Sequence, residues 1–198
     1  PRVSLAQTLT ETVRAKLGGG VYHQYLQLVA TELVSAADFY VPLDETTDVG
    51  RSWQVVGGVD WRWRPSWLLS VEGYYTDLSN LVLYDNSSPN SENATTADDL
   101  FYLGGSGYAS GAEIFLRRDA GAFTGWLGYT LGWTRRTFPE VNEGRAFAPK
   151  YDRRHDVSAV VEYATGKWRL SGAFVYATGQ AFTPVSGRYS LVSPTTGT

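Results

Sequence analysis

A run of six residues, "YDRRHD" at 151–156, gathers many of the side chains in this chain that most often carry chemistry. It holds two aspartates, two arginines and one of the two histidines of the 198-residue sequence. A carboxylate beside a histidine is typical of general acid–base and nucleophilic catalysis, and arginines bind carboxylates and phosphates. The run therefore suggests three hypotheses: a catalytic site, a ligand contact, or a cluster of ion pairs that fixes the chain locally.

Catalysis fits the sequence poorly. No nucleophile-elbow, zinc-protease or phosphate-loop motif occurs, and if a strand begins near Arg154, then His155 and Asp156 point to opposite faces of the sheet. We expect instead a structural clamp where a loop rejoins a strand, made by Asp152, Arg153, Arg154 and Asp156. In it the aspartates would hold the arginines by bidentate hydrogen bonds. A ligand contact through Arg153, Arg154 or His155 is the alternative, and no catalytic residue is assigned.

A second candidate is the stretch "GGGVYHQYLQL" at 18–28, in which three ring side chains follow a run of glycines. Tyr22, His23 and Tyr25 could form a stacking surface for a flat ligand such as a sugar or a chelate. The alternative is that these rings belong to an aromatic girdle at a membrane interface. Arg145 and Phe147, which precede the charged run, complete the candidate ligand contacts.

Composition excludes several classes of function. The formal net charge of −3 offers no basic stripe, so nucleic acid is not an expected partner. The absence of cysteine excludes disulfides, thiolate metal sites and thiol nucleophiles. Two histidines are few for a zinc site, and we expect no metal and no cofactor. The abundant aromatic residues (7 Trp, 13 Tyr, 8 Phe) and 21 Gly favour β-structure.

Apolar and polar residues alternate along most of the chain, which predicts half-buried strands rather than helices. About eight strands are expected, near 2–8, 12–24, 50–64, 67–84, 107–118, 122–137, 154–164 and 168–178. Short turns are expected near 10–11, 65–66, 119–121 and 165–167. Long loops are expected near 25–49, 85–106, 138–153 and 179–198. The pattern predicts an all-β, antiparallel up-and-down sheet, with residues 1–198 forming part of one β-barrel domain.

Alternation alone fits a soluble barrel or sandwich as well as it fits a membrane barrel. The asymmetry between short turns and long loops favours a transmembrane barrel, because outer-membrane barrels have short turns at one end and long loops at the other. One side of the expected strands is polar enough for a wet lumen, and carries Arg14, Lys16, Asp60, Arg62, Glu72, Glu113, Arg117, Glu162 and Arg169. Tryptophans lie near the short turns, as in an interfacial girdle: Trp61, Trp63, Trp67 and Trp168.

Several motifs occur in an order that resembles a known family. They are "LLSVEGYYTDLSNLVLYD" (68–85), "GAEIFLRR" (111–118), "GWLGYT" (125–130), "RAFAPKYDRRHD" (145–156) and "WRLSGAFVYATG" (168–179). In this order and spacing they resemble the C-terminal β-barrel portion of TonB-dependent outer-membrane receptors. The resemblance extends over roughly residues 1–185.

The resemblance implies a fold and a function. Such receptors import scarce nutrients of the siderophore, cobalamin, saccharide or peptide class across the outer membrane of Gram-negative bacteria. They use a barrel of about 22 strands. The implied partners are outer-membrane lipid, the rest of the barrel, an N-terminal plug, a TonB-type energy-transducing complex acting through that plug, and the nutrient. Because the sequence has no plug and no coupling box, we expect it to supply about eight strands of the larger barrel, with no enzymatic activity.

Two other hypotheses remain open from the sequence. A small passive or structural outer-membrane barrel would close eight strands on themselves and fill its interior with side chains. A soluble carbohydrate-binding β-domain would instead bury the Trp- and Tyr-rich face.

Overall fold

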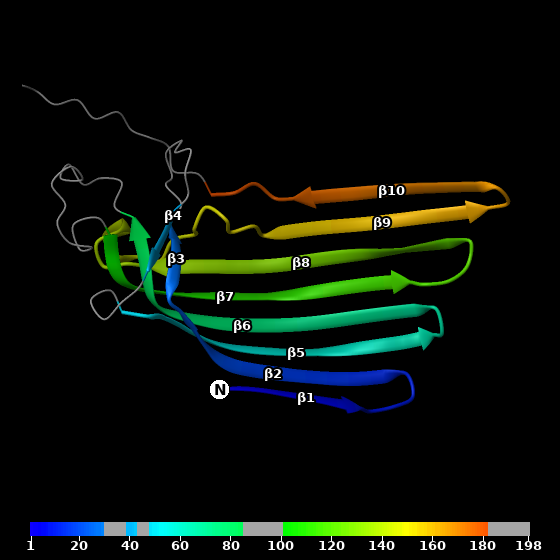
Figure 1. Ribbon diagram of the computed structural model, residues 1–198, viewed down its shortest axis with the longest axis horizontal. Coiled ribbons are helices and arrows are strands. Elements are labelled where there is room, and N and C mark those ends of the chain that lie inside the picture. The colour runs from blue at the N-terminus through cyan, green and yellow to red at the C-terminus, as the bar shows by residue number, and fades with distance from the viewer. Residues whose placement is uncertain (30–38, 43–47, 85–100, 182–198) are drawn as a thin grey trace, which may run out of the picture.

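The computed structural model describes residues 1–29, 39–42, 48–84 and 101–181, which form one large antiparallel sheet and a small hairpin (Figure 1). The large sheet has eight strands in the order β1-β2-β5-β6-β7-β8-β9-β10, and β3 pairs with β4. The strands of the large sheet are β1 (Arg2–Thr8), β2 (Val13–Gln24), β5 (Gly50–Arg64), β6 (Trp67–Tyr84), β7 (Phe101–Arg118), β8 (Phe123–Thr137), β9 (His155–Thr165) and β10 (Trp168–Ala177). The hairpin comprises β3 (Leu26–Val29) and β4 (Phe39–Pro42).

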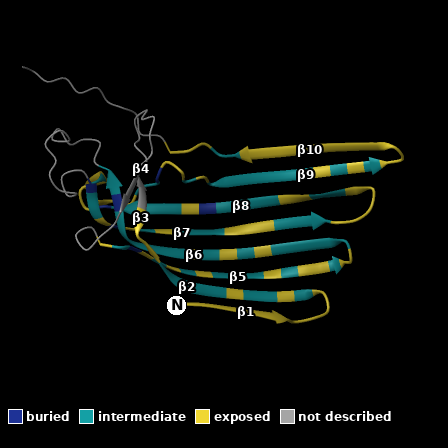
Figure 2. Cartoon of the chain, viewed as in Figure 1, coloured by how far each residue is buried: buried dark blue, intermediate teal, exposed yellow. Residues whose placement is uncertain are grey.

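The prediction of an all-β, antiparallel up-and-down sheet is confirmed, since strands adjacent in the sheet are adjacent in sequence apart from the β3–β4 hairpin. The sheet does not close, because β1 and β10 each pair with a single neighbour. Figure 2 shows these two edge strands exposed along nearly their whole length. A closed barrel is therefore not present in the described residues.

Two predicted loops contain more strand than expected. β7 begins at Phe101 rather than near residue 107, and its pairing with β6 passes through register shifts at Leu78–Leu81 and Leu81–Leu83. Such bulges interrupt the alternation on which the prediction relied. The hairpin β3–β4 lies within the predicted loop 25–49. The remainder of the predicted loops falls partly outside the described residues, at 30–38, 43–47, 85–100 and 182–198.

The four short turns lie at one end of the sheet and the long connections at the other (Figure 1). Gly166 in the β9–β10 turn has φ = 56° and Gly121 in the β7–β8 turn has φ = 105°, conformations that glycine adopts without steric cost. The backbone N–H of Asp119 donates to the carbonyl of Ser66 at 3.0 Å, which ties the β7–β8 turn to the β5–β6 turn. These two turns are thus connected at one end of the sheet.

The register gives the sheet two unlike faces. On the apolar face, neighbouring strands place side by side Val59, Val71, Ile114, Tyr129 and Val157. On the polar face, the adjacent row contains Gly58, Glu72, Glu113, Thr130 and Asp156. The apolar face is uncovered, with Ile114 40% and Leu170 62% exposed. The hydrophobic side chains of the sheet therefore have no protein partner layer among the described residues.

The buried apolar side chains lie instead at the loop end. Phe138, just after β8, is fully buried, and Val82 and Phe101 are nearly so. The Phe138 ring lies on the backbone of Gly105, where an added Cβ would come within 2.2 Å of the ring. The Phe147 ring lies 6.4 Å from that of Phe138, between centroids. This packing anchors the connection between β8 and β9 onto the β6–β7 hairpin.

The β8–β9 loop, residues 138–154, lies wholly within the described residues. It contains one turn of 3₁₀ helix, η2 (Asn142–Gly144), and an isolated antiparallel bridge between Arg136 and Phe147. Within the described residues, no helix is both long enough and apolar enough to cross a membrane.

Substituting Gly105→Ala should destabilise the protein, because the new methyl group would overlap a ring that has no room to move. We expect a loss of about 1–3 kcal/mol in the free energy of unfolding, measured by urea unfolding of the purified protein. The matched control is Gly73→Ala, whose Cβ would meet its nearest atom at an ordinary 3.8 Å. Equal stabilities for the two variants would contradict the packing of Phe138 on Gly105.

Candidate functional site

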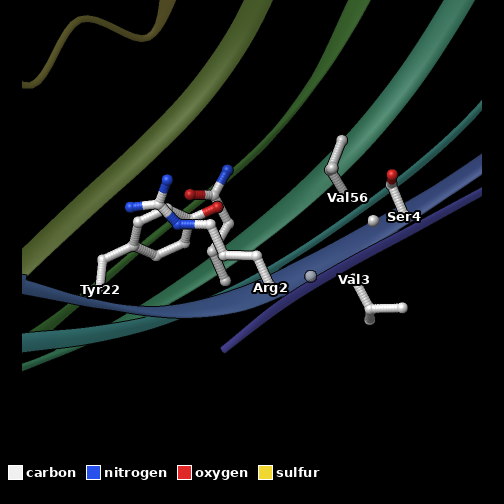
Figure 3. Close-up of a pocket in the computed structure, with 8 residues that line it drawn as sticks. Arg2, Val3, Ser4, Tyr22 and Val56 are labelled. Atoms are coloured by element: carbon white, nitrogen blue, oxygen red, sulfur yellow. The ribbon is translucent and has the colours of Figure 1, made fainter.

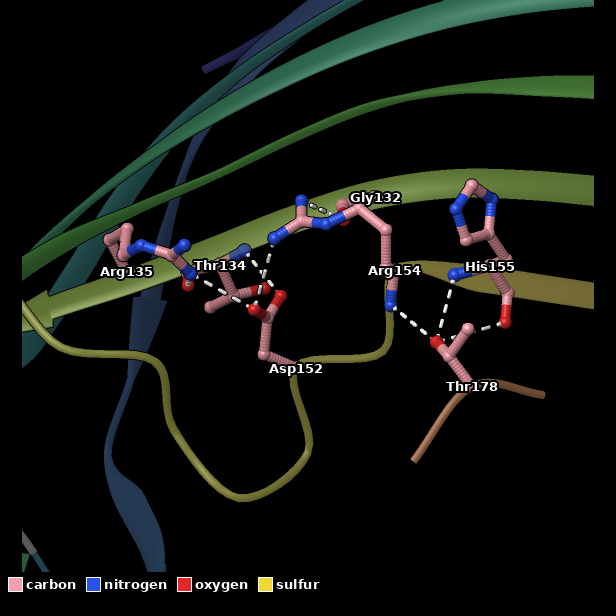
Figure 4. Close-up of polar contacts among 7 residues, drawn as sticks. All are labelled: Gly132, Thr134, Arg135, Asp152, Arg154, His155 and Thr178. Carbon is pink, nitrogen blue, oxygen red and sulfur yellow. Dashed lines mark hydrogen bonds and ion pairs between the residues drawn. The ribbon is translucent and has the colours of Figure 1, made fainter. Parts of the chain in front are cut away.

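The charged run at 151–156 lies where the β8–β9 loop rejoins β9, and Asp152 is at the centre of its contacts (Figure 4). The side chain of Asp152 is only 8% exposed. Its Oδ1 accepts the backbone N–H of Thr134 at 2.8 Å. Its Oδ2 accepts from Arg135 at 2.9 Å and lies 3.5 Å from a guanidinium nitrogen of Arg154. Two arginines and a backbone donor thus compensate a nearly buried carboxylate, which would be costly if left unpaired.

Arg154 attaches the same junction to β8. Its Nη1 donates to the carbonyl of Gly132 at 2.6 Å, and its guanidinium carbon lies 4.6 Å from the centroid of a Trp133 ring. The backbone carbonyl of Arg154 accepts the N–H of Gly132 at 3.1 Å, one residue beyond the last β8–β9 pair. Both the main chain and the side chain of Arg154 therefore extend the β8–β9 pairing into the loop.

Thr178 ties β10 to the junction and is a residue that the sequence reasoning missed. Its hydroxyl oxygen accepts the backbone N–H groups of Arg154 at 2.9 Å and His155 at 3.1 Å. Its own N–H donates to the carbonyl of His155 at 2.9 Å. Counting back from the two-residue turn at Gly166–Lys167 places Thr178 opposite His155, so a register argument could have found it.

The expected bidentate pairs do not occur. Asp152 is shared between two arginines and a backbone N–H, so neither arginine engages both of its oxygens. Arg153 and Asp156 approach only to 3.9 Å and both side chains are almost half exposed, an arrangement worth little in water. The geometry of Asp152 and Arg154 is that of a clamp, whereas Arg153 and Asp156 lie at its margin.

His155 and Asp156 point to opposite faces of the sheet, as the alternation predicts. His155 pairs with Leu131 on the apolar face, where its Nδ1 lies 2.9 Å from the hydroxyl of Tyr129. Asp156 pairs with Thr130 on the polar face. The histidine and this carboxylate therefore cannot share a proton directly.

The two predicted ligand contacts within the β8–β9 loop have different environments. Phe147 packs against Phe138, so its ring contributes to the loop core. Arg145 is exposed and forms an ion pair with Glu143, also exposed, at the tip of the loop. The tip has an unusual backbone, because Asn142 (φ = 53°) and Glu143 (φ = 56°) adopt the left-handed conformation that non-glycine residues seldom adopt. Arg145 is the one of the two that is free to meet a ligand.

The Tyr151 ring connects the loop to β8 through a contact with Arg136. The guanidinium carbon of Arg136 lies 5.2 Å from the centroid of the Tyr151 ring. Partial burial raises the pKa of the Tyr151 hydroxyl, the charge of Asp152 adds to this effect, and Arg136 opposes it. The phenol is therefore neutral at physiological pH, and its ring presents an uncharged face to the arginine.

The aromatic candidates on β2 lie apart from the charged run, since β5, β6, β7 and β8 separate β2 from β9. Tyr22 lies on the polar face, with the guanidinium carbon of Arg2 4.4 Å from its ring centroid. The two line a shallow pocket of about 250 Å³ together with Gln54 (Figure 3). His23 pairs with Arg51 on the apolar face, and Tyr25 is 63% exposed beyond the end of β2. The predicted contacts thus form two separate groups.

The middle of the polar face carries an ion cluster. Lys16 contacts Asp60 at 2.9 Å and Glu72 at 2.5 Å, and the hydroxyl of Ser70 donates to Asp60 at 2.7 Å. Glu113 lies directly across from Glu72, at a depression of about 400 Å³. The sequence placed these residues on one face, but only the register of four strands shows which of them meet.

None of these groups has the composition of a metal centre. Among the described residues, no three histidine or acidic side chains gather closely enough to hold a metal ion. Comparison of the chain with models of known protein families and with curated proteins gave no match. The chemistry of these residues therefore has to be inferred from their geometry. The charged run joins β8, β9 and β10 at the loop end, and the side chains of Arg145, Arg2 and Tyr22 remain accessible.

Substituting Arg154→Ala should impair assembly more than ligand specificity, because it removes the bond to Gly132 and one contact of Asp152. We expect a loss of about 1–3 kcal/mol in stability and a smaller folded fraction, measured as heat-modifiable mobility in electrophoresis. Arg153→Ala is the matched control and should change stability by under about 0.5 kcal/mol, since the one ion pair that it makes with a described residue is long and exposed. Normal folding of Arg154→Ala with loss of ligand binding would reverse the assignment.

Proposed function

We propose that this chain forms part of the wall of a transmembrane β-barrel in the outer membrane of a Gram-negative bacterium. The barrel would belong to an active-transport receptor of the TonB-dependent class, which binds a scarce nutrient and imports it. The observation that carries the membrane part of the proposal is an uncharged band across the apolar face, bounded by charged and aromatic residues at both ends.

The band is clearest on β6 and β7. On the apolar face of β6 the first charged residue from the turn end is Asp77, ten positions after Trp67. On β7 the corresponding stretch runs from Arg118 to Tyr108, which is paired with Asp77 and with Arg135. Ten residues of strand extend about 33 Å, and a strand tilt of 35–45° reduces this to about 25 Å of height. That is the height of the lipid-facing band of outer-membrane barrels.

The polar face has the character of a water-filled interior. Its charged residues pair across strands, as Lys16 does with Asp60 and Glu72. Such residues would be costly in lipid but are compatible with a wet lumen. The apolar face, for its part, has no second packed layer among the described residues, and a soluble β-sandwich needs one.

The open edges favour a barrel larger than this sheet. β1 and β10 lie at opposite margins and each pairs on one side only (Figure 1). An unpaired strand edge is not tolerated within the hydrocarbon of a membrane, because its backbone groups would have no partners. Additional strands on both sides, as in a barrel of about 22 strands, would satisfy both edges.

The receptor part of the proposal rests on the order of the sequence motifs and on the loop end of the sheet. In this proposal the loop clamp at Asp152 and Arg154 holds the extracellular loop, and Arg145 and Tyr22 contribute to the vestibule. In this proposal the protein binds the nutrient and allows its gated passage, and it breaks no covalent bond. A plug and a TonB-type complex would supply the energy coupling, and the nutrient class would be siderophore, cobalamin, saccharide or peptide.

Substituting Leu131→Arg on the apolar face of β8 should prevent insertion, because Leu131 pairs with Ala112, about midway between Arg118 and Tyr108, so the charge would lie near the middle of the lipid-facing band. A cost of about 2–4 kcal/mol is expected, and the full-length gene product should be lost from the outer-membrane fraction. The matched control is Thr130→Arg on the same strand, which would face Glu113 and Asp156 in the lumen and should be tolerated. Soluble behaviour of the unsubstituted protein without detergent would contradict the membrane proposal and favour a carbohydrate-binding domain.

The receptor part of the proposal is tested by nutrient uptake in cells that carry the unsubstituted full-length protein. Uptake of the nutrient through an active receptor should stop when the TonB-type complex is deleted. Uptake that persists after the deletion would favour a passive barrel.

A further inference from the structure

We propose that a row of three residues at the turn end, Arg64–Trp67–Arg118, binds the phosphate of an anionic phospholipid headgroup. The inference rests on the membrane part of the proposed function and adds to it a specific lipid site. It is carried by the pairing of these three residues and by guanidinium groups that have no carboxylate partner among the described residues.

The three side chains lie side by side on the apolar face. Arg64 pairs with Trp67 across the β5–β6 turn, and Trp67 pairs with Arg118 on β7. A register shift between Trp61 and Arg64 turns Arg64 to the same face as Trp67. Paired Cα atoms in antiparallel strands are about 5 Å apart, so the two arginines begin about 10 Å apart. Both side chains are long enough to reach one phosphate over the tryptophan between them.

Contacts at the turn fix the guanidinium of Arg118. Its central carbon lies 5.2 Å from the centroid of a Trp67 ring, and its Nε donates to the carbonyl of Ala120 at 3.2 Å. Gly121 makes room for it, since a Cβ there would lie 2.9 Å from an Arg118 nitrogen. The Trp63 ring stacks on that of Trp67, with the ring centroids 5.4 Å apart. The arginine is therefore held in place before any ligand binds.

The remaining N–H groups of the two arginines have no acceptor in the described structure. Arg118 uses one of its five donors, on Ala120, and Arg64 is exposed with no ion pair to a described residue. The nearest acidic side chain in sequence, Asp119, pairs instead with Arg117 at 2.8 Å. Two arginine side chains without a counter-ion on an otherwise apolar face favour the binding of an anion from outside the protein.

A phospholipid phosphate fits the position as well as the charge. The row forms the turn-end boundary of the uncharged band, which is the depth at which headgroups meet a membrane barrel. Arginine binds phosphate through two parallel N–H bonds, and tryptophan is enriched at this depth. The lipid is thus expected in the leaflet on the side of the short turns, with its chains along Leu69 and Leu116, the next paired residues of the apolar face.

The test uses the full-length protein in lipid nanodiscs of phosphatidylcholine mixed with phosphatidylglycerol, with retained lipid identified by native mass spectrometry. The protein should retain phosphatidylglycerol in preference to phosphatidylcholine. The double variant R64Q/R118Q should retain about tenfold less, as expected from losing charge-assisted hydrogen bonds. The matched control is R117Q, which removes an adjacent arginine already paired with Asp119 and should retain lipid normally.

Equal retention of the two lipids by the unsubstituted protein would overturn the inference, whether or not the double variant folds. Unchanged retention by inserted R64Q/R118Q would also overturn it, as would complete displacement of the lipid by inorganic phosphate. In each of these cases the protein still inserts, so the membrane proposal stands. Failure of the unsubstituted protein to insert would instead contradict the membrane proposal and this inference with it.

Discussion

The antiparallel register across eight strands determines which side chains of this protein meet. Short turns fix the register of four of the seven strand pairs, and the alternation of side chains along a strand then assigns each strand residue to one of two faces. A slip of one residue would exchange the faces, turning Glu72 toward the apolar side and Val71 toward the ion cluster. The uncharged band, the Lys16 cluster and the Arg64–Trp67–Arg118 row are all consequences of this one constraint.

The polar groups at the two ends of the sheet differ in whether they have partners within the protein. At the loop end, Asp152, Arg154 and Thr178 join β8, β9 and β10 through hydrogen bonds, and Phe138 adds a small buried core. At the turn end, arginines and tryptophans remain available to the surroundings. An asymmetry of this kind suits a protein whose two ends face different environments, one presenting loops to ligands and one resting on lipid headgroups.

The sequence predicted the strands well because alternation and tight turns are local signals. Seven of the eight main strands begin within a residue or so of the expected position, and β7 differs because bulges near Leu81 hide its start. The contacts of the charged run were harder to predict. Arg135 and Thr178 reach Asp152 and His155 from other strands, and a partner of this kind depends on register rather than on neighbouring residues. The prediction that His155 and Asp156 point to opposite faces was correct because it depends only on the alternation of side chains along one strand.

The most direct test of a lipid-facing side of the sheet is a labelling scan along β6, which is practical because the chain has no native cysteine. Single cysteines from Leu69 to Tyr75 would carry a spin label in lipid vesicles, and collisions with oxygen and with a water-soluble nickel complex would be measured. If one side of the sheet faces lipid, accessibility should alternate strictly, with Leu69, Val71, Gly73 and Tyr75 accessible to oxygen and Ser70, Glu72 and Tyr74 to nickel. Uniform accessibility, or alternation in the opposite phase, would contradict the membrane proposal.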